Sequence, residues 1–278
     1  MSCSPGLTPS SPDNPWGAPV YRRGIVSSTM DEARLLASEG APHGTVVSAD
    51  FQERGRGRSG GRVWQAEGGK NLFFTILLRY PASSGMAAVP EALTLRAGLA
   101  VALAVEDFDP ALGRVLIKWP NDIMLSGAHV SGTGDSGARK TAGILTEGGG
   151  DCVYIGIGVN LAQTEFPPEL RGKATSIHLA HRALAPPPPS ADPGALLGLI
   201  LSRLYRELEG GAENWRARIS DRLYLRGRPV RFLAGAAGQG EPLTGTLSGI
   251  GESGELLIIP EGEERPRPFF SGELDVYA

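Results

Sequence analysis

Residues 52–64 read Q-E-R-G-R-G-R-S-G-G-R-V-W, a short segment rich in arginine and glycine. Glycine lets a backbone turn tightly and approach a ligand, and the arginine guanidinium is a planar cation that fits phosphate or carboxylate oxygens. The segment therefore predicts an anion-binding loop. Runs of arginine and glycine also occur in disordered tails that hold nucleic acid, so the flanking sequence has to decide.

The segments on both sides of this loop have the pattern of buried strands. Residues 44–51 precede it and include Thr45, Val46 and Val47, and residues 71–80 follow it and read N-L-F-F-T-I-L-L-R-Y. Branched and aromatic side chains favour strands. Disordered tails that bind RNA are normally long, repeated and terminal, whereas this loop lies between two core strands. The flanks therefore favour the anion-binding interpretation.

The overall composition argues against a general nucleic-acid binder. The 278 residues carry a formal net charge of −3, so the loop arginines are a local concentration on a mildly acidic chain. A hydrophobic fraction of 41% is enough to bury a core. Cys3 and Cys152 are the only cysteines, which excludes a disulfide framework and a cysteine-rich zinc site and fits a cytoplasmic protein. No apolar run is long enough for a membrane helix, so we expect no membrane binding.

The order of the remaining patterns predicts two domains. Residues 20–225 mix strand and helix patterns, including helices from Thr29, over 90–107 with Pro90 in the first turn, over 192–208 and over 215–225. They predict an α+β domain with a mixed central sheet and packed helices. Residues 226–278 are short β segments between glycine turns, which predicts a small barrel. Residues 1–19, rich in Ser, Pro and Gly, are expected to be a disordered leader.

The sequence has no Walker A motif and no H-E-x-x-H motif, and no catalytic nucleophile is evident from it. The charged candidates for a site are basic: Arg56, Arg58, Arg62, Lys118 and Lys140. Such a set suits phosphoryl or nucleotidyl transfer, in which the protein positions the reactants and stabilises charge.

Two smaller features each have a structural and a functional interpretation. Ser28 and Thr29 precede a helix, where they are either helix caps or contacts for a small polar ligand. Gly156 and Gly158 lie on one side of a strand, where glycine indicates the close approach of a ligand or of a neighbouring element.

Five motifs in this order resemble the bacterial biotin protein ligases. They are S-S-T at 27–29, G-R-G-R at 55–58 with R-V-W at 62–64, K-W-P-N-D at 118–122, K-T-A-G-I-L at 140–145 and G-I-G-V-N at 156–160. The resemblance runs from about residue 21 to the C-terminus. It implies a catalytic domain like that of class II aminoacyl-tRNA synthetases and biotin ligases over residues 20–225, and an SH3-like domain over residues 226–278.

The resemblance implies a biotin-[acetyl-CoA-carboxylase] ligase. Such enzymes join biotin to ATP, giving biotinoyl-AMP and pyrophosphate, and then pass biotin to a lysine of the biotin carboxyl carrier domain of a carboxylase. Biotin, ATP and Mg²⁺ are thus the implied small molecules, and the carrier domain is the implied partner. The alternatives are a lipoate or octanoate ligase or transferase of the same superfamily, and a nucleic-acid-binding module that uses the arginine loop.

The resemblance also implies roles for single residues. Biotin contacts are expected from Ser28, Thr29, Met30, Gln52, Gly55, Arg56, Gly57, Arg58, Lys140, Gly156 and Gly158. Nucleotide contacts are expected from Arg56, Arg58, Arg62, Trp64, Lys118, Asn121, Lys140 and Asn160, with Trp64 stacked on adenine. Arg58 and Lys140 are the expected catalytic residues, and Asp122 is expected at the magnesium ion. The loop is expected to be disordered when empty and to fold over the adenylate.

The sequence departs from the family pattern at three points. An extra glycine, Gly60 or Gly61, displaces Arg62, and Met30 stands where asparagine is common. Only about twenty residues precede the first strand, too few for the winged-helix domain of dual-function members. We therefore expect a monofunctional ligase without specific DNA binding, and we consider a homodimer.

Overall fold

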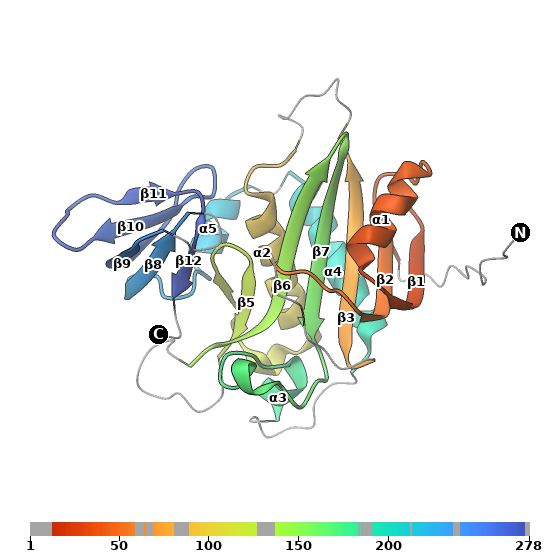
Figure 1. Cartoon of the computed structure of the whole chain (residues 1–278), viewed down its shortest axis with the longest axis horizontal. Coiled ribbons are helices and arrows are strands. Elements are labelled where there is room, and N and C mark those ends of the chain that lie inside the picture. The colour runs from red at the N-terminus through yellow and green to blue at the C-terminus, as the bar shows by residue number, and fades with distance from the viewer. Residues whose placement is uncertain are drawn as a thin grey trace, which may run out of the picture.

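A central mixed sheet and a smaller β domain make up the protein in a computed structural model (Figure 1). The structure describes residues 13–58, 64, 69–80, 89–126, 137–182, 184, 191–211, 213–235 and 240–275. The central sheet has seven strands in the order β1-β2-β3-β7-β6-β5-β4. Its strands are β1 (Val20–Val26), β2 (Thr45–Gln52), β3 (Asn71–Arg79), β4 (Leu116–Lys118), β5 (Asp122–Leu125), β6 (Arg139–Gly149) and β7 (Cys152–Asn160). The predicted α+β class is confirmed.

Strand register brings distant residues into rows across the sheet. β1 and β2 are parallel, and the other neighbours are antiparallel. Gly156 of β7 lies between Thr75 of β3 and Leu145 of β6. Gly158 lies opposite Gly143 of β6. These two rows form the floor of the site described below.

The helices cover both faces of the central sheet. They are α1 (Thr29–Ser38), α2 (Leu93–Phe108), α3 (Ile177–His181), α4 (Pro193–Leu208) and α5 (Trp215–Ser220). Alternate side chains of a strand point to opposite faces, so Val46 of β2 joins the core beneath α2 and α4, and Val47 joins the core beneath α1. Ser28 accepts a hydrogen bond from Met30 N and caps α1, whereas Thr29 is the first helical residue and donates its hydroxyl to Gln52. No described helix is long and apolar enough to cross a membrane.

The β domain is a five-stranded antiparallel sheet in the order β11-β10-β9-β8-β12. Its strands are β8 (Pro229–Ala234), β9 (Pro242–Ile250), β10 (Leu256–Pro260), β11 (Arg267–Phe269) and β12 (Gly272–Asp275). Phe232 is fully buried in its core, 6.1 Å from the ring of Trp119, which precedes β5. Trp119 Nε1 also donates to Gly254 O at 3.0 Å. The β domain is therefore packed against the turn that contains residues 118–122.

The predicted leader is too long at its C-terminal end, because residues 13–19 are packed on the protein. Asn14 Nδ2 donates to Gly44 O at 2.9 Å. Trp16 stands edge-on to Tyr205 at 5.1 Å, and a Cβ on Gly44 would collide with its ring. An apolar and aromatic contact of this kind outweighs the polar composition of the segment. Residues 1–12 lie outside the described part of the chain.

Two helix boundaries also differ from the sequence expectation. The helix expected to open at Pro90 begins at Leu93, after Ala92 in the left-handed region at φ 50°. The helix expected over residues 215–225 ends at Ser220, because the following residues turn back to pair with β4, where Tyr224 N donates to Ile117 O. At the second boundary a tertiary contact overrides the local pattern.

Candidate active site

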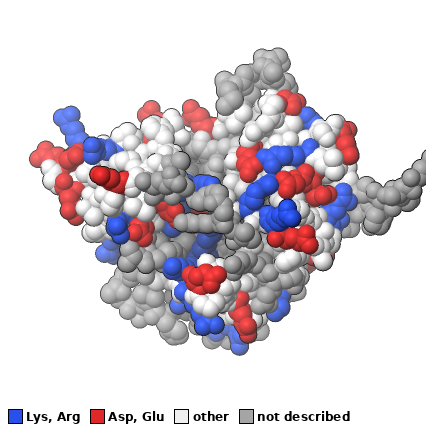
Figure 2. All heavy atoms as spheres, in the orientation of Figure 1, with Lys and Arg blue, Asp and Glu red and all other residues white. Residues whose placement is uncertain are grey.

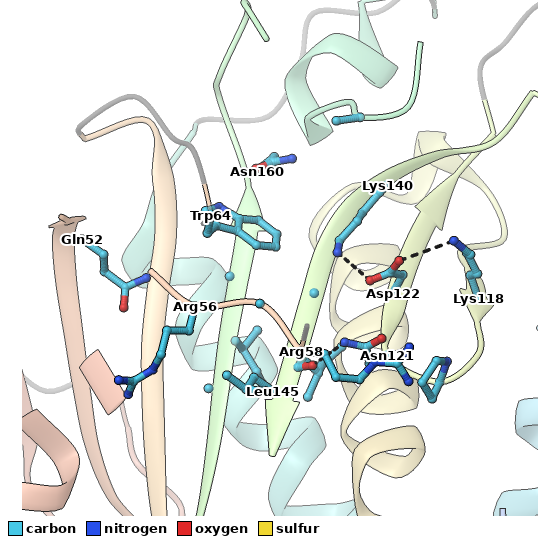
Figure 3. A pocket seen from close by; sticks show the side chains of 18 of the residues that line it. Gln52, Arg56, Arg58, Trp64, Lys118, Asn121, Asp122, Lys140, Leu145 and Asn160 are labelled. Carbon is cyan, nitrogen blue, oxygen red and sulfur yellow. Dashed lines mark hydrogen bonds and ion pairs between the residues drawn. The ribbon is translucent and has the colours of Figure 1, made fainter. Parts of the chain in front are cut away.

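A cavity of about 580 Å³ opens above the rows of β3, β7 and β6, between the central sheet and the β domain. Figure 2 shows lysine and arginine atoms in this hollow, and a mixture of both charge signs over α1. Its volume is typical of a site for a small organic ligand or cofactor. Figure 3 shows the side chains that line it.

Most of the predicted site residues meet in this cavity. Those that line it are Ser28, Thr29, Met30, Gln52, Arg56, Gly57, Arg58, Trp64, Lys118, Asn121, Asp122, Lys140, Gly156, Gly158 and Asn160. Gly55 does not line it. A Cβ at Gly55 would lie 3.1 Å from Trp64 Cβ, and Gly55 O accepts from Trp64 N at 2.9 Å, so Gly55 supports the base of the loop. Arg62, with residues 59–63 of the loop, lies outside the described residues.

One end of the cavity holds a hydrogen-bonded set of neutral polar groups. Thr29 N and Oγ1 both donate to Gln52 Oε1, at 2.8 and 3.0 Å. Thr29 Oγ1 also lies 2.9 Å from Thr75 Oγ1, and both threonines are buried. Because the single Thr29 hydroxyl hydrogen is used on Gln52, Thr75 must be the donor to Thr29.

This arrangement fixes what the polar end can offer a ligand. Gln52 Oε1 accepts both hydrogen bonds from Thr29, so the N–H groups of Gln52 Nε2 point away from Thr29 and can donate to a ligand. Thr75 has spent its hydrogen on Thr29, so its oxygen can only accept further bonds. A ligand that presents a carbonyl next to an N–H therefore finds a donor in Gln52 and an acceptor in Thr75.

The walls next to this polar end are apolar. Met30 is buried, and its Cε would lie 2.9 Å from a Cβ placed on Gly156. Gly156 therefore makes room for Met30 at the wall of the cavity, in addition to lining it. Leu145, which lies opposite Gly156 on β6, completes this section.

Trp64 lies on the second row of the floor. A Cβ on Gly158 would sit 3.2 Å from the indole, and one on Gly143 would sit 2.8 Å from it. These two glycines thus form a flat backbone surface that supports the ring. Lys140 Nζ stands 5.3 Å from the ring centroid, within the range of a cation–π contact.

Two buried polar atoms at this end of the cavity have no hydrogen-bond partner within the described chain: Trp64 Nε1 and Asn160 Oδ1. The Asn160 amide is held by its other atom, since Nδ2 donates to Thr175 O at 3.0 Å. Asn160 lies near Trp64 in Figure 3. A buried polar group without a partner is costly, so this end of the cavity fits a ligand that carries both a donor and an acceptor.

A cluster of charges lies opposite Trp64. Asp122 Oδ1 is 2.6 Å from Lys140 Nζ, and Asp122 Oδ2 is 3.9 Å from the buried Lys118 Nζ. Burial alone raises the pKa of Asp122, but Lys140, Lys118 and Arg58 together outweigh it and hold the pKa below the usual value. The carboxylate is therefore ionised at neutral pH and is paired with both lysines beside the cavity.

The two loop arginines of the cavity point in different directions (Figure 3). Arg56 lies at the rim, where its guanidinium makes a bidentate contact with Asp31, with Nη2–Oδ1 at 2.7 Å. Arg58 reaches to the β domain, and its Nη2 donates to Gly272 O at 2.7 Å.

The described residues do not form a magnesium site of their own. Mg²⁺ prefers several oxygen ligands in an octahedron. Within the described residues no group of three or more His, Cys, Asp or Glu side chains lies together, and Asp122 is engaged by two lysines. We therefore assign no step to a metal held by the protein.

Sequence reasoning missed a further set of lining residues, which includes Thr75, Phe166, Glu169, Leu170, Lys173, Ala174 and Glu273. Thr75 could have been noticed as the polar residue inside the apolar run 72–78. The segment 166–174 carries no motif, and it reaches the cavity because Lys140 N donates to Lys173 O and Thr175 N donates to Lys140 O.

Comparison with known proteins identifies the family to which this chain is related. Residues 24–160 match the Biotin/lipoate A/B protein ligase family. The chain is 32% identical over 255 residues to the biotin-[acetyl-CoA-carboxylase] ligase of Paracoccus denitrificans, covering 83% of this chain and 90% of that protein. It is 38% identical over 172 residues to the bifunctional ligase/repressor BirA of Bacillus spizizenii, covering 59% of this chain and 47% of that protein. The chain thus spans about half the length of this bifunctional relative.

A solved structure extends the similarity to the whole fold. The biotin protein ligase from Aquifex aeolicus in complex with biotin and ATP superposes with a TM-score of 0.71 and 27% identity, covering 92% of this chain and 97% of that chain. The similarity includes both the central sheet and the β domain. This chain belongs to the biotin protein ligase family.

Proposed function

We propose that the protein activates biotin with ATP and transfers it to a lysine of the carrier domain of a biotin-dependent carboxylase. The observation that carries the proposal is the polarity of one cavity. A neutral recess of Thr29, Gln52 and Thr75 lies at one end, and Lys118, Lys140 and Arg58 lie at the other. A molecule with a neutral cyclic urea at one end and a carboxylate at the other matches both ends.

The neutral recess orients biotin. The urea of biotin has a carbonyl oxygen between two N–H groups, so Gln52 Nε2 would donate to the carbonyl and Thr75 Oγ1 would accept from an N–H. The walls formed by Met30 and Leu145 would cover the apolar rings. This binding would fix the carboxylate near Lys140.

The charged end serves the first reaction. A carboxylate oxygen of biotin attacks the α-phosphorus of ATP, and the bond from that phosphorus to the bridging oxygen breaks to release pyrophosphate. Lys140 and Arg58 would stabilise the negative charge on the α-phosphate and on the attacking carboxylate. Trp64 and Asn160 supply the unpaired donor and acceptor that adenine, with an amino group beside ring nitrogens, can satisfy.

The second reaction needs no further phosphate chemistry. The amine of the acceptor lysine attacks the acyl carbon of biotinoyl-AMP, AMP leaves with the electrons of the broken C–O bond, and the amine loses a proton. The cationic groups would stabilise the departing phosphate. The carrier domain, the magnesium ion, the cytoplasmic location and the homodimer stay predictions from the sequence.

Exchange of labelled pyrophosphate into ATP tests the proposal, with biotin, lipoate or no acid in parallel. We expect exchange that depends on biotin. Lipoate has no urea, so it would leave Gln52 and Thr75 without partners and should support far less exchange. Exchange with lipoate and not with biotin would favour the lipoate alternative. Absence of exchange together with salt-sensitive RNA binding would favour the nucleic-acid alternative.

A further inference from the structure

The β domain reaches the site through β12. The Gly272 carbonyl accepts the hydrogen bond from Arg58 Nη2 at 2.7 Å, between residues that are 214 positions apart. The next residue, Glu273, lines the cavity. A strand of the β domain therefore touches the loop that the sequence marks as the anion-binding element.

The position of the Gly272 carbonyl is set by tight packing. Gly272 has φ 149°, and a Cβ there would lie 2.1 Å from Phe232 Cζ and 2.6 Å from Leu233 O. Only glycine fits this backbone position. Since Phe232 is fully buried, β12 cannot shift away from the core of the β domain without opening it.

The same core also holds the turn on the other side of the site. Trp119 packs 6.1 Å from Phe232 and donates from Nε1 to Gly254 O. Trp119 follows Lys118 directly and lies three residues before Asp122. One small aromatic core thus fixes the distance between Arg58 and the charged turn.

We propose that the β domain positions Arg58 for the adenylate. The Gly272 carbonyl holds the Arg58 guanidinium by a hydrogen bond, and the Trp119–Phe232 contact fixes the position of that carbonyl relative to residues 118–122. The proposal rests on the proposed function. A guanidinium has five N–H donors in a rigid plane. A hydrogen bond from one of these donors to the Gly272 carbonyl fixes the plane of the guanidinium, and with it the directions of the other N–H bonds. Arg56, held by Asp31 at the rim, lacks such a contact with the β domain in the described structure.

The first test replaces Gly272 with alanine, with Gly262→Ala as the matched control. Gly262 also has a positive φ, at 81°, but a Cβ there meets nothing within 4 Å. The readout is the rate at which preformed biotinoyl-AMP leaves the enzyme, together with KM for ATP and kcat of pyrophosphate exchange. We expect Gly272→Ala to speed this release about 10-fold, the effect of one hydrogen bond to a charged group. Gly262→Ala should release at the parent rate.

A double-mutant cycle shows whether the effect passes through Arg58. If Gly272 acts by positioning Arg58, Gly272→Ala should add less than about twofold to the release rate of Arg58→Ala. Effects that multiply would show general damage and overturn the proposal. A Gly272→Ala enzyme that retains the adenylate like the parent would overturn it as well.

Trp119→Phe keeps the test decisive if Gly272→Ala does not fold. It removes the hydrogen bond to Gly254 O and keeps an aromatic ring against Phe232. Trp16→Phe is the control for this variant. It also removes an indole hydrogen bond, the one that Trp16 Nε1 donates to Glu209, and neither residue lines the cavity. We expect Trp119→Phe to release biotinoyl-AMP faster than the parent, and Trp16→Phe to release it at the parent rate. In an enzyme that already carries Arg58→Ala, Trp119→Phe should not increase the release rate further. Equal release from both tryptophan variants would contradict the proposal. A parent enzyme that forms no biotinoyl-AMP would overturn the proposed function itself.

Discussion

The ammonium group of Lys140 lies 2.6 Å from the carboxylate of Asp122, and this ion pair joins β6 to the first residue of β5 beside the cavity. The Asp122 side chain is 18% exposed, so the pair is only partly screened by water. Because Lys118 also faces Asp122, the carboxylate is the negative partner of two cations. It holds both ammonium groups beside the cavity.

The pKa of Asp122 predicts an acid-dependent loss of stability. Because the folded pKa is lower than the unfolded one, Asp122 contributes fully to the free energy of unfolding above about pH 4 and loses this contribution as the pH falls through the folded pKa. Asp122→Asn should remove it. We expect the melting temperature of the parent to fall more steeply than that of the variant below about pH 4. Parallel curves would contradict the assignment.

The loop arginines should differ in their effect on the adenylate. Under the proposed function, Arg58→Ala and Lys140→Ala would each remove a contact to the phosphate, and we expect adenylate formation or retention to weaken about 10- to 150-fold. Arg56 is half exposed and already paired with Asp31, so Arg56→Ala should cost less than about fivefold. Single-turnover formation and release of biotinoyl-AMP measures all three. Equal losses for Arg56 and Arg58 would show that the rim contact opens when the ligand binds.

Thr75 should matter for biotin and not for ATP. Thr75→Val removes the acceptor and the hydrogen bond to Thr29, and we expect biotin to bind about 10- to 100-fold more weakly. Thr75→Ser keeps the hydroxyl and should bind within a few-fold of the parent. Calorimetric titration with biotin, and separately with ATP, checks this. A valine variant with parental biotin affinity would remove Thr75 from the recess.

Asn160 should select the base of the nucleotide. Its free Oδ1 can accept from the amino group of adenine, whereas guanine presents a carbonyl at the same place. Asn160→Ala should raise KM for ATP about 10-fold and leave KM for GTP, which we expect to be higher in the parent, almost unchanged. The preference for ATP over GTP should therefore decrease. Pyrophosphate exchange with each nucleotide gives both values. An equal loss for ATP and GTP would indicate a structural role through Thr175.

Much of the fold could be predicted from local pattern. Buried strands such as β3 consist of a mostly apolar run, and α1 starts directly after the capping residue Ser28, so neighbouring residues determine both. The Ser27–Thr29, Lys118–Asp122 and Gly156–Asn160 motifs likewise lead directly to the cavity. Helix ends and the packed residues 13–19 could not be predicted, because they depend on contacts such as Trp16 with Tyr205.

The missed part of the site depends on pairing between distant segments. Thr75 faces the cavity because β3 pairs with β7 in the register that sets it opposite Gly156. Gly272 and Glu273 belong to β12 of the β domain, and no sequence motif marks them. The glycines show the same limit. The sequence of Gly156 and Gly158 indicated the close approach of a ligand or of a neighbouring element, and Met30 and Trp64 occupy part of that space.

Transfer of biotin from the isolated enzyme–adenylate complex tests the central claim most directly. The enzyme is incubated with biotin and ATP, freed of both by rapid gel filtration, and mixed with a biotin carboxyl carrier domain. We expect a carrier that binds streptavidin, and no signal when its acceptor lysine is replaced by arginine. An adenylate that hydrolyses without labelling the carrier, or a complex that forms with lipoate and not with biotin, would contradict the account.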